Sequence, residues 1–373
     1  MEKVLMKGNE ALAESAIRAG CRYYFGYPIT PQSEIPEYLS KRMPQVGGVF
    51  LQAESEVAAI NMVYGAAAAG ARTMTSSSSL GISLKLEGIS YIAAAELPCV
   101  IVNIMRGGPG LGGIQPAQSD YFQATKGGGH GDYRLIVYAP SSVQELADMT
   151  YQAFDIADMY RNPVMILGDG LLGQMMEQVE LPEFKENKLI KTADKSWAAT
   201  GTKESRPPNI FNTLYLDPEK LEELNLALFE KYKAIESREV RAEEYMTADA
   251  DLLLVAYGIT ARIVKTAIDE ARKKGIKAGL MRPITLWPFP KALANQLSAQ
   301  VKCILTVEMS QGQLIEDVCL AVGRRVPVHF YGRVGGMIPS VEAVYHEICR
   351  YAGMKDDALL ELDAGIRYTY AEV

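Results

Sequence analysis

Four polar side chains that could do chemistry follow segments with the composition of strands. Thr30 lies in the turn 27–31, Glu54 and Glu56 begin an alanine-rich segment about 26 residues later, and Arg106 ends an apolar run about 50 residues after that. Ligands of parallel sheets bind at the carboxyl ends of strands, so a carboxylate, a hydroxyl and a guanidinium there could form one pocket. The simpler alternative is structural, with the carboxylates favoured by a helix dipole and Arg106 in a salt bridge. The residue types alone leave both interpretations open.

A glycine-rich segment, 108–113, has the G-x-G-x-x-G spacing of dinucleotide-binding loops and follows a predicted strand. In a dinucleotide site a helix begins inside this motif, with its N-terminus toward the pyrophosphate. Here Pro109 and Pro116 bracket the segment, which favours a loop at an active site or an interface. The sequence also has no Gly-Lys-Ser/Thr after these glycines and no G-x-S-x-G, which excludes a P-loop and a serine-hydrolase elbow.

Gly168-Asp169-Gly170 follows another apolar run, which is how the magnesium and diphosphate site of thiamine-diphosphate enzymes begins. That site also needs a pair of asparagines roughly 25 to 30 residues later, since the Asp and one Asn both coordinate the metal. Residues 194–202 contain no such pair. We therefore predict that Asp169 lies in a turn, that this chain holds no metal, and that it cannot complete such a site by itself.

The scarce residues and the charge exclude further kinds of site. No two of the five cysteines are closer than 16 positions, and only three histidines occur. This spacing excludes CxxC motifs and iron–sulfur binding runs, and it is typical of a reducing compartment. A net charge of -7 provides no basic surface for nucleic acid. The sequence has no 18-residue apolar run and no signal peptide, so we expect a cytoplasmic protein without a membrane span.

The elements that must position these side chains alternate between strand and helix. Up to about residue 170, short apolar runs such as 99–104 alternate with amphipathic segments, including a helix over 10–19 that Asn9 is expected to cap. This alternation is typical of parallel strands joined by helical crossovers and predicts an α/β fold.

Residues from about 180 to 247 are rich in Glu and Lys and contain a predicted charged helix near 218–244. A second α/β pattern starts near residue 248. With 373 residues the chain is therefore predicted to hold two α/β domains, at 1–180 and 248–373, joined by an arm at 181–247.

Several strings closely resemble the alpha subunit of the thiamine-dependent 2-oxoacid:ferredoxin oxidoreductases. In the first domain they are Tyr-Pro-Ile-Thr-Pro (27–31), Glu-Ser-Glu-Val-Ala-Ala-Ile (54–60), Met-Arg-Gly-Gly-Pro-Gly (105–110) and Ser-Asp-Tyr-Phe-Gln-Ala-Thr (119–125). Residues 251–258, 281–288 and 307–309 resemble the transketolase C-terminal domain. The resemblance covers about residues 1 to 345 and implies a parallel-sheet, pyrimidine-binding domain followed by a transketolase C-terminal-like α/β domain. Arg-Gly-Gly-Pro-Gly-Leu-Gly-Gly, from Arg106, is most similar to the branched-chain, 2-oxoisovalerate type, with the 2-oxoglutarate type close behind.

The resemblance also implies roles for individual residues. Glu56 matches the glutamate that hydrogen-bonds the pyrimidine nitrogen of thiamine and promotes proton removal from the thiazolium ring. Glu54 is the nearby alternative, and Glu56 is preferred because it alone precedes Val-Ala-Ala.

Two further residues match groups that act on the substrate. Thr30 matches the threonine beside the substrate carbonyl, and Arg106 matches the arginine that pairs with the 2-oxoacid carboxylate. Tyr27, Pro28 and Ile29 would contact the pyrimidine ring.

The implied reaction is oxidative decarboxylation of a branched-chain 2-oxoacid to acyl-CoA and CO2, with ferredoxin reduced and coenzyme A as cosubstrate. The implied partners are a beta subunit that binds the diphosphate and Mg²⁺, and gamma and iron–sulfur subunits that carry the [4Fe-4S] clusters. A homodimer within this hetero-oligomer is expected. The alternatives are the 2-oxoglutarate type, a self-contained transketolase-like enzyme, which would need its own Asn pair, and a non-catalytic scaffold subunit. Substrate preference, subunit stoichiometry and reaction direction stay open at this point.

Overall fold

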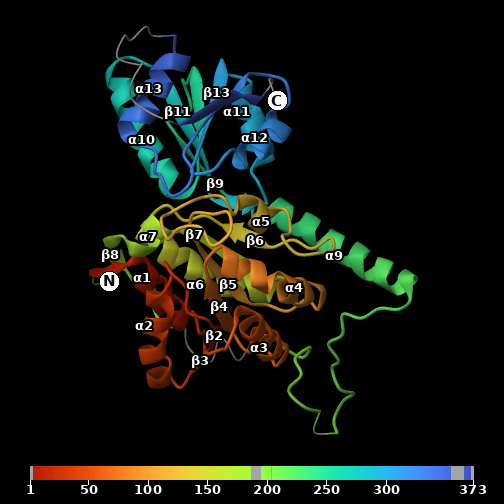
Figure 1. Cartoon of the computed structure of the whole chain (residues 1–373). Coiled ribbons are helices and arrows are strands. Elements are labelled where there is room, and N and C mark those ends of the chain that lie inside the picture. Colours follow the sequence, from red (N-terminus) through yellow and green to blue (C-terminus); the bar gives the residue numbers. More distant parts are fainter. Residues whose placement is uncertain (1–2, 186–194, 203, 354–364, 371–373) are drawn as a thin grey trace.

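The computed structural model describes residues 3–185, 195–202, 204–353 and 365–370, and it folds into two stacked α/β units (Figure 1). Each unit is built around a mainly parallel sheet, which confirms the predicted fold class. No helix in these ranges combines the length and the apolar character needed to cross a lipid bilayer.

The first unit contains a seven-stranded sheet in the order β12-β6-β7-β5-β4-β2-β3. Its parallel strands are β2 (Tyr23–Gly26), β3 (Val49–Gln52), β4 (Thr73–Ser77), β5 (Val100–Met105), β6 (Ile136–Tyr138) and β7 (Val164–Asp169). β5 and β7 are buried at every position, as expected of central parallel strands covered on both faces. A separate two-stranded ribbon joins β1 (Lys3–Lys7) to β8 (Met176–Glu180).

Helices cover this sheet in two groups. α1, α2 and α6 pack together, and α3 and α4 pack together. Their bounds, with those of the two short helices, are α1 (Gly8–Arg18), α2 (Glu34–Arg42), α3 (Glu56–Ala68), α4 (Leu80–Ala94), α5 (Tyr121–Thr125), α6 (Val143–Tyr160) and α7 (Gly170–Gln174). A 3-10 turn, η1, covers Pro44–Val46.

The prediction that Asn9 caps the first helix is wrong. α1 begins at Gly8, and Asn9 lies inside it, fully buried. Its amide donates to Pro31 O at 2.9 Å and to Glu34 Oε2 at 2.8 Å. Asn9 therefore ties α1 to the turn that carries Thr30.

The second unit contains a six-stranded sheet in the order β15-β14-β13-β10-β11-β9. The strands are β9 (Ala242–Tyr245), β10 (Leu252–Val255), β11 (Ala278–Pro283), β13 (Cys303–Glu308), β14 (Val328–Gly332) and β15 (Ile366–Thr369). The helices are α10 (Gly258–Lys273), α11 (Lys291–Ser298), α12 (Leu314–Val322) and α13 (Val341–Tyr351).

The two units interlock through short strands. β12 (Thr285–Trp287) belongs to the C-terminal half of the chain but pairs antiparallel with β6 of the first sheet. β9 lies within the predicted arm 181–247 but pairs antiparallel with β11 of the second sheet. The charged helix of that segment, α9 (Pro218–Arg238), therefore ends earlier than predicted, and it projects from the body (Figure 1). Residues 186–194 and 203 of the segment lie outside the described residues.

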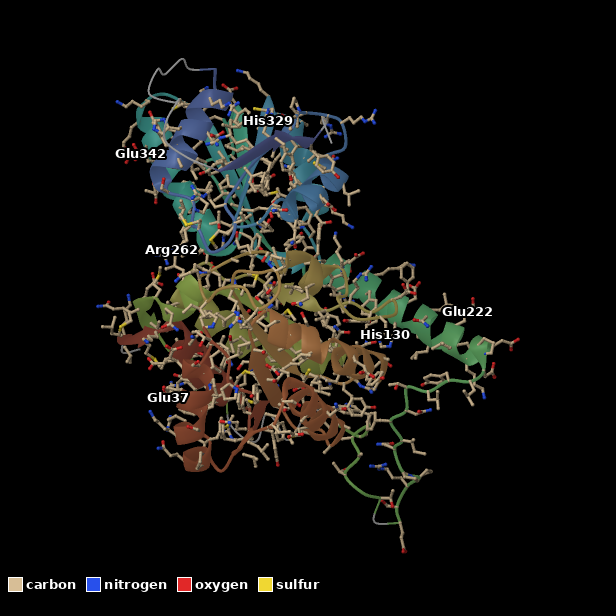
Figure 2. The ribbon with its side chains drawn as sticks, in the orientation of Figure 1. Glu37, His130, Glu222, Arg262, His329 and Glu342 are labelled. Atoms are coloured by element: carbon tan, nitrogen blue, oxygen red, sulfur yellow. The ribbon has the colours of Figure 1, made fainter. Side chains whose placement is uncertain are left out.

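Buried polar contacts hold the units together. Gln118 is fully buried; its amide donates to Tyr257 O at 2.9 Å and accepts from Thr260 Oγ1 at 2.8 Å. Arg262 lies where the units meet, and it donates to Glu177 Oε1 at 2.8 Å (Figure 2). The carboxyl ends of β10 and β13 therefore face the first unit.

Candidate active site

The predicted site residues gather at one edge of the first sheet because their strands are neighbours. β5, β4, β2 and β3 lie side by side and run parallel, with Ser77 opposite Asn103 and Gly26 opposite Gln52. The segments that leave their carboxyl ends carry Arg106, Thr30 and Glu56 in turn. Strand order alone thus brings together residues up to 76 positions apart.

Arg106 is joined directly to the turn that contains Thr30. Its Nη1 donates to Thr30 O at 3.0 Å, and its Nη2 donates to Leu111 O at 2.8 Å. Arg106 is 7% exposed, and its Nε has no partner in the described part of the chain. It forms no ion pair with a described carboxylate, so the structural alternative of a salt bridge is not supported.

A hydrogen-bonded group beneath Arg106 fixes its backbone. The Arg106 N–H donates to Ser79 Oγ at 3.0 Å, and Ser79 Oγ donates to Asp120 Oδ2 at 2.6 Å. Asn103 Nδ2 donates to the same carboxylate at 3.0 Å. Burial raises the pKa of Asp120, while the bonds from Ser79 and Asn103 lower it. Sequence reasoning did not identify this group, because its members are 17 to 41 positions apart and share no motif.

Glu56 is the first residue of α3, after Ser55, whose Oγ accepts from Ala58 N. The Glu56 side chain is 6% exposed, and its carboxylate accepts no hydrogen bond from a described residue. Gly81 lies so close that a Cβ there would come within 2.8 Å of Glu56 Oε1 and 2.0 Å of Ser77 Oγ. Glu54, in contrast, is exposed. Burial therefore favours Glu56 over Glu54.

Two more buried polar atoms at this edge lack partners. Ser77 and Ser78 follow one another at the end of β4, both are fully buried, and neither hydroxyl has a hydrogen-bond partner among the described residues. Buried polar groups are normally satisfied, so an unpaired carboxylate, an unpaired guanidinium nitrogen and two unpaired hydroxyls at one edge point to a polar ligand.

Residues 27–30 of the turn present their side chains outward, and Pro31 is buried. Tyr27, Pro28 and Thr30 are exposed, and Ile29 is half-buried. The turn is held from below by buried Gln32, whose amide donates to Tyr27 O at 3.5 Å and accepts from Ser76 Oγ at 2.5 Å. The Thr30 hydroxyl is thus available to a ligand, on a backbone tied to β4.

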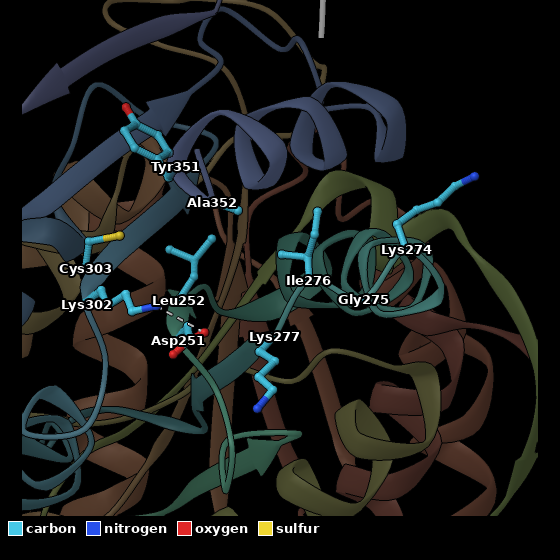
Figure 3. Close-up of a pocket in the computed structure, with 10 residues that line it drawn as sticks. All are labelled: Asp251, Leu252, Lys274, Gly275, Ile276, Lys277, Lys302, Cys303, Tyr351 and Ala352. Carbon is cyan, nitrogen blue, oxygen red and sulfur yellow. Dashed lines mark ion pairs between the residues drawn. The ribbon is translucent and has the colours of Figure 1, made fainter. Parts of the chain in front are cut away.

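A cavity of about 460 Å³ opens beside Thr30. Its lining includes Pro116 and Leu171 of the first unit and Ile338 of the second. A second pocket, of about 290 Å³, lies in the second unit near Asp251, Lys277 and Lys302 (Figure 3). It lies at the amino-terminal ends of β10 and β13, the opposite edge of that sheet from the one where ligands of parallel sheets bind. The cavity beside Thr30 touches the candidate site at that residue, whereas Arg106 and Glu56 do not line it.

Of the two other motifs, the segment 108–113 is the loop that was predicted, whereas Asp169 lies in no turn and joins a strand directly to a helix. The segment 108–113 is a loop in which Gly113 N donates to Gly107 O at 2.9 Å, and no helix begins in it. Asp169 ends β7, and its Oδ1 caps α7 by accepting from Leu171 N and Leu172 N, each at 3.0 Å. Burial raises the pKa of Asp169 to about 6, and three backbone N–H groups oppose the rise.

Potential metal ligands are scattered in the described ranges. His130 and His329 lie in different units (Figure 2). No three His, Cys, Asp or Glu residues in the described ranges are grouped as metal ligands.

Comparison with known proteins identifies the family. The model described as pyruvate flavodoxin/ferredoxin oxidoreductase, thiamine diphosphate-binding, matches residues 14–247, and pyruvate:ferredoxin oxidoreductase core domain II matches residues 250–344. Ketoisovalerate oxidoreductase subunit VorB of Methanothermobacter marburgensis is 52% identical over 96% of this chain and 100% of the relative. 2-Oxoglutarate synthase subunit KorA of Methanothermobacter thermautotrophicus is 35% identical over 94% of this chain and 99% of the relative.

Comparison with solved structures supports the same family. The 2-oxoglutarate:ferredoxin oxidoreductase from Magnetococcus marinus, with 2-oxoglutarate, coenzyme A and succinyl-CoA bound, matches with a TM-score of 0.84 and 27% identity; the match covers 94% of this chain and 65% of that chain. A split-gene transketolase, an inactive beta4 tetramer, shares the fold alone, with a TM-score of 0.58 and 15% identity over 94% of this chain and 99% of that chain. The resemblance seen in the sequence is therefore confirmed, and the chain belongs to the thiamine-diphosphate-dependent 2-oxoacid:ferredoxin oxidoreductases, as a subunit of the branched-chain type.

Proposed function

We propose that this chain is the alpha subunit of an enzyme that oxidatively decarboxylates 2-oxoisovalerate to acyl-CoA and CO2 and reduces ferredoxin. The ketoisovalerate oxidoreductase subunits are 52% and 51% identical to it, against 35% for the 2-oxoglutarate synthase subunit. The observation that carries the proposal is the Glu56 carboxylate, buried without a hydrogen-bond donor at the edge that also holds Arg106 and Thr30.

The residues at this edge fit the pyrimidine half of thiamine diphosphate. Glu56 lacks a donor, which a ring nitrogen carrying a proton would supply, and the unpaired hydroxyl of Ser77 lies near it across Gly81. Tyr27 and Ile29 would contact the ring from the exposed turn. When bound, thiamine diphosphate supplies the nucleophilic carbon and the electron sink for decarboxylation.

The chain's own residues would bind and orient the cofactor and the substrate, and one of them would hold a proton. Glu56 would share a proton with the pyrimidine nitrogen, and its burial would limit the competition of water for that bond. Arg106 has five N–H donors and uses two of them on carbonyls, so three, including Nε–H, stay available for the 2-oxoacid carboxylate. The exposed Thr30 hydroxyl donates to the oxo group of the substrate.

The rest of the site is proposed to lie on partners. Asp169 serves as a helix cap and has no asparagine pair to work with, which supports a separate beta subunit that holds the diphosphate and Mg²⁺. Gamma and iron–sulfur subunits would carry the [4Fe-4S] clusters, ferredoxin would accept the electrons, and coenzyme A would accept the acyl group. We also infer a cytoplasmic location and a homodimer within the hetero-oligomer. A non-catalytic scaffold subunit is disfavoured because Glu56, Thr30 and Arg106 are all present.

The test is a Glu56→Gln substitution in the complex reconstituted with its partner subunits. Glutamine keeps the size of the side chain but cannot hold the proton, so viologen reduction with 2-oxoisovalerate should fall on the order of 10²-fold or more. Glu54→Gln is the matched control, because Glu54 is two positions away and exposed, and it should keep the wild-type rate. Full activity of Glu56→Gln would contradict the assignment of Glu56. Faster turnover of 2-oxoglutarate than of 2-oxoisovalerate by the wild type would contradict the substrate assignment.

A further inference from the structure

Lys85 of α4 is a fully buried amine that the proposed function does not use. Its Nζ donates to Thr75 Oγ1 at 2.6 Å and to Ser76 O at 3.2 Å. Both partners belong to β4 and both are neutral. A buried cation is costly unless a charge compensates it, so two neutral acceptors do not by themselves explain an ammonium group at this position.

The first turns of α4 place Lys85 on the side of Glu56. Gly81, the residue against which Glu56 Oε1 lies, comes four positions before Lys85. Residues four apart in a helix share a face, so the face that meets the carboxylate at Gly81 carries the amine one turn further on. The Glu56 charge acts on Lys85 across this space: burial lowers the pKa of Lys85 to about 7, and Glu56 opposes that fall.

The other charged groups around α4 lie farther toward solvent. Besides Glu56, α3 contributes the titratable but half-buried Tyr64, and β4 and β5 contain no charged residue. The loop 126–134 packs on α4 with Lys126, His130 and Asp132 exposed and Arg134 half-buried. Beyond the end of β5, Arg106 and Asp120 are held by their own hydrogen bonds. Glu56 is therefore the charged group that acts on the pKa of Lys85, although no ion pair joins the two in the described part of the chain.

We infer that Lys85 is a positioning residue for Glu56: the buried amine attracts the carboxylate toward the face of α4 that carries Gly81 and Lys85, and so keeps it in place for the donor of the cofactor. The inference rests on the proposed function only for the role of Glu56, and the pairing itself does not depend on it. The alternative is a purely structural Lys85 that ties α4 to β4 through Thr75 and Ser76. The two interpretations differ in whether Lys85 and Glu56 are energetically coupled.

A double-mutant cycle on the full chain, without cofactor or partner subunits, measures that coupling. The unfolding equilibrium constant is determined for the wild type, Lys85→Met, Glu56→Gln and the double variant. If the pair is coupled, the effect of Lys85→Met differs more than about threefold between the wild-type and Glu56→Gln backgrounds. A difference of threefold or less would overturn the inference. Glu87→Gln is the matched control: Glu87 is exposed on the same helix, two positions from Lys85, and its effect should add to that of Lys85→Met.

The reconstituted complex provides a second measurement. Lys85→Met removes a buried amine whose pKa is about 7, so the kcat/KM profile for 2-oxoisovalerate should lose a pH dependence near 7 that the wild type shows. A structural role would instead lower the rate equally at all pH values, which would also overturn the inference. If the cycle shows coupling while Glu56→Gln stays active, the proposed function fails and the pair stands. If Glu56→Gln is inactive and the cycle is additive, the proposed function stands and the inference about the Lys85–Glu56 pair fails.

Discussion

Arg106 and Glu56 are buried at the same edge of the sheet but are held in different ways. Hydrogen bonds from Arg106 to two loop carbonyls fix the guanidinium, and Ser79 fixes its backbone. Glu56 is positioned by the start of α3 and by contact with Gly81, and its oxygens have no donor among the described residues. The arginine is thus preorganised for a carboxylate, whereas the glutamate keeps its full hydrogen-bonding capacity for a ligand.

Asp169 is the residue whose burial should be visible in the pH dependence of stability. Its pKa is raised from 3.8 to about 6, so between these values the folded chain holds a proton that the unfolded chain has released. Stability from this group is therefore highest at low pH and falls as the pH rises through about 6, by up to about 3 kcal/mol. Asp169→Asn cannot titrate and should lack this slope.

The measurement is the difference in unfolding free energy between the wild type and Asp169→Asn from pH 4 to pH 7. Any bond lost by the amide adds an offset that does not change with pH. If this difference did not change with pH over the range, it would contradict a buried Asp169 carboxyl with a raised pKa.

At the scale of elements, the start of α4 is the contact on which the site depends. The helix begins at Leu80, directly after Ser79, which has a φ of 37° and supports Arg106. Its second residue, Gly81, meets Glu56 of α3, and its sixth, Lys85, meets β4. The first two turns of α4 thus connect the ends of β3, β4 and β5.

Gly81→Ala should disturb the site through this contact. The new Cβ would lie 2.0 Å from Ser77 Oγ and 2.8 Å from Glu56 Oε1, so the carboxylate must move. We expect viologen reduction by the reconstituted complex to fall about tenfold or more, and the chain to lose about 1–3 kcal/mol of stability in denaturant unfolding.

Gly65→Ala is the matched control on α3. A Cβ there has nothing within 4 Å, so the exchange should stabilise the helix by about 0.5–1 kcal/mol and leave the rate unchanged. Equal rates for the two variants would show that the Gly81 contact does not hold Glu56.

At the scale of the whole molecule, the two units are joined by exchanged strands and by a buried charge. Arg282 of β11 is 2% exposed; it donates to Glu145 of α6 at 2.8 and 2.6 Å and to Glu243 of β9 at 2.7 Å. Burial raises the pKa of Glu145, but the guanidinium and Ser141 bring it below its ordinary value. This one residue links both sheets, because α6 belongs to the first unit.

Arg282→Met should therefore weaken the junction. It removes the cation that Glu145 and Glu243 share. Glu243 keeps Lys265, and because each carboxylate is about 30% exposed, water reduces the cost to about 1–3 kcal/mol in denaturant unfolding. Lys302→Met, which removes an exposed pair with Asp251, should stay within about 0.5 kcal/mol of the wild type. If Arg282→Met unfolded at the same denaturant concentration as the wild type, the exchanged strands alone would hold the two units together.

The division of the site between subunits leads to a binding prediction. Because the diphosphate and metal ligands are proposed to lie on the beta subunit, the isolated chain should give no detectable heat with thiamine diphosphate and Mg²⁺ in calorimetry. Addition of the beta subunit should restore binding. Micromolar binding to the isolated chain would contradict the split site.

Much of this organisation could be predicted from the sequence. The apolar runs at 99–104 and 164–167 became β5 and β7, since strands buried on both faces leave an unbroken apolar signal. The family strings predicted Thr30, Glu56 and Arg106, and strand order explains why residues so far apart in sequence meet at one edge. The loop at 108–113 was also predicted correctly, because glycine and proline act locally on the backbone.

The tertiary structure decided what depends on distant partners. Nothing local distinguishes Asn9 as a link to Pro31 and Glu34 from a helix cap, or shows that residues 285–287 would join the sheet of the other unit. Lys85 has no sequence signal of its own, since a lysine in a helix is ordinarily solvated, and only the packing of α4 on β4 and α3 buries it beside Glu56. Element type follows from local periodicity, whereas burial and charge environment follow from which elements pack together, and the chemistry of this site depends on the latter.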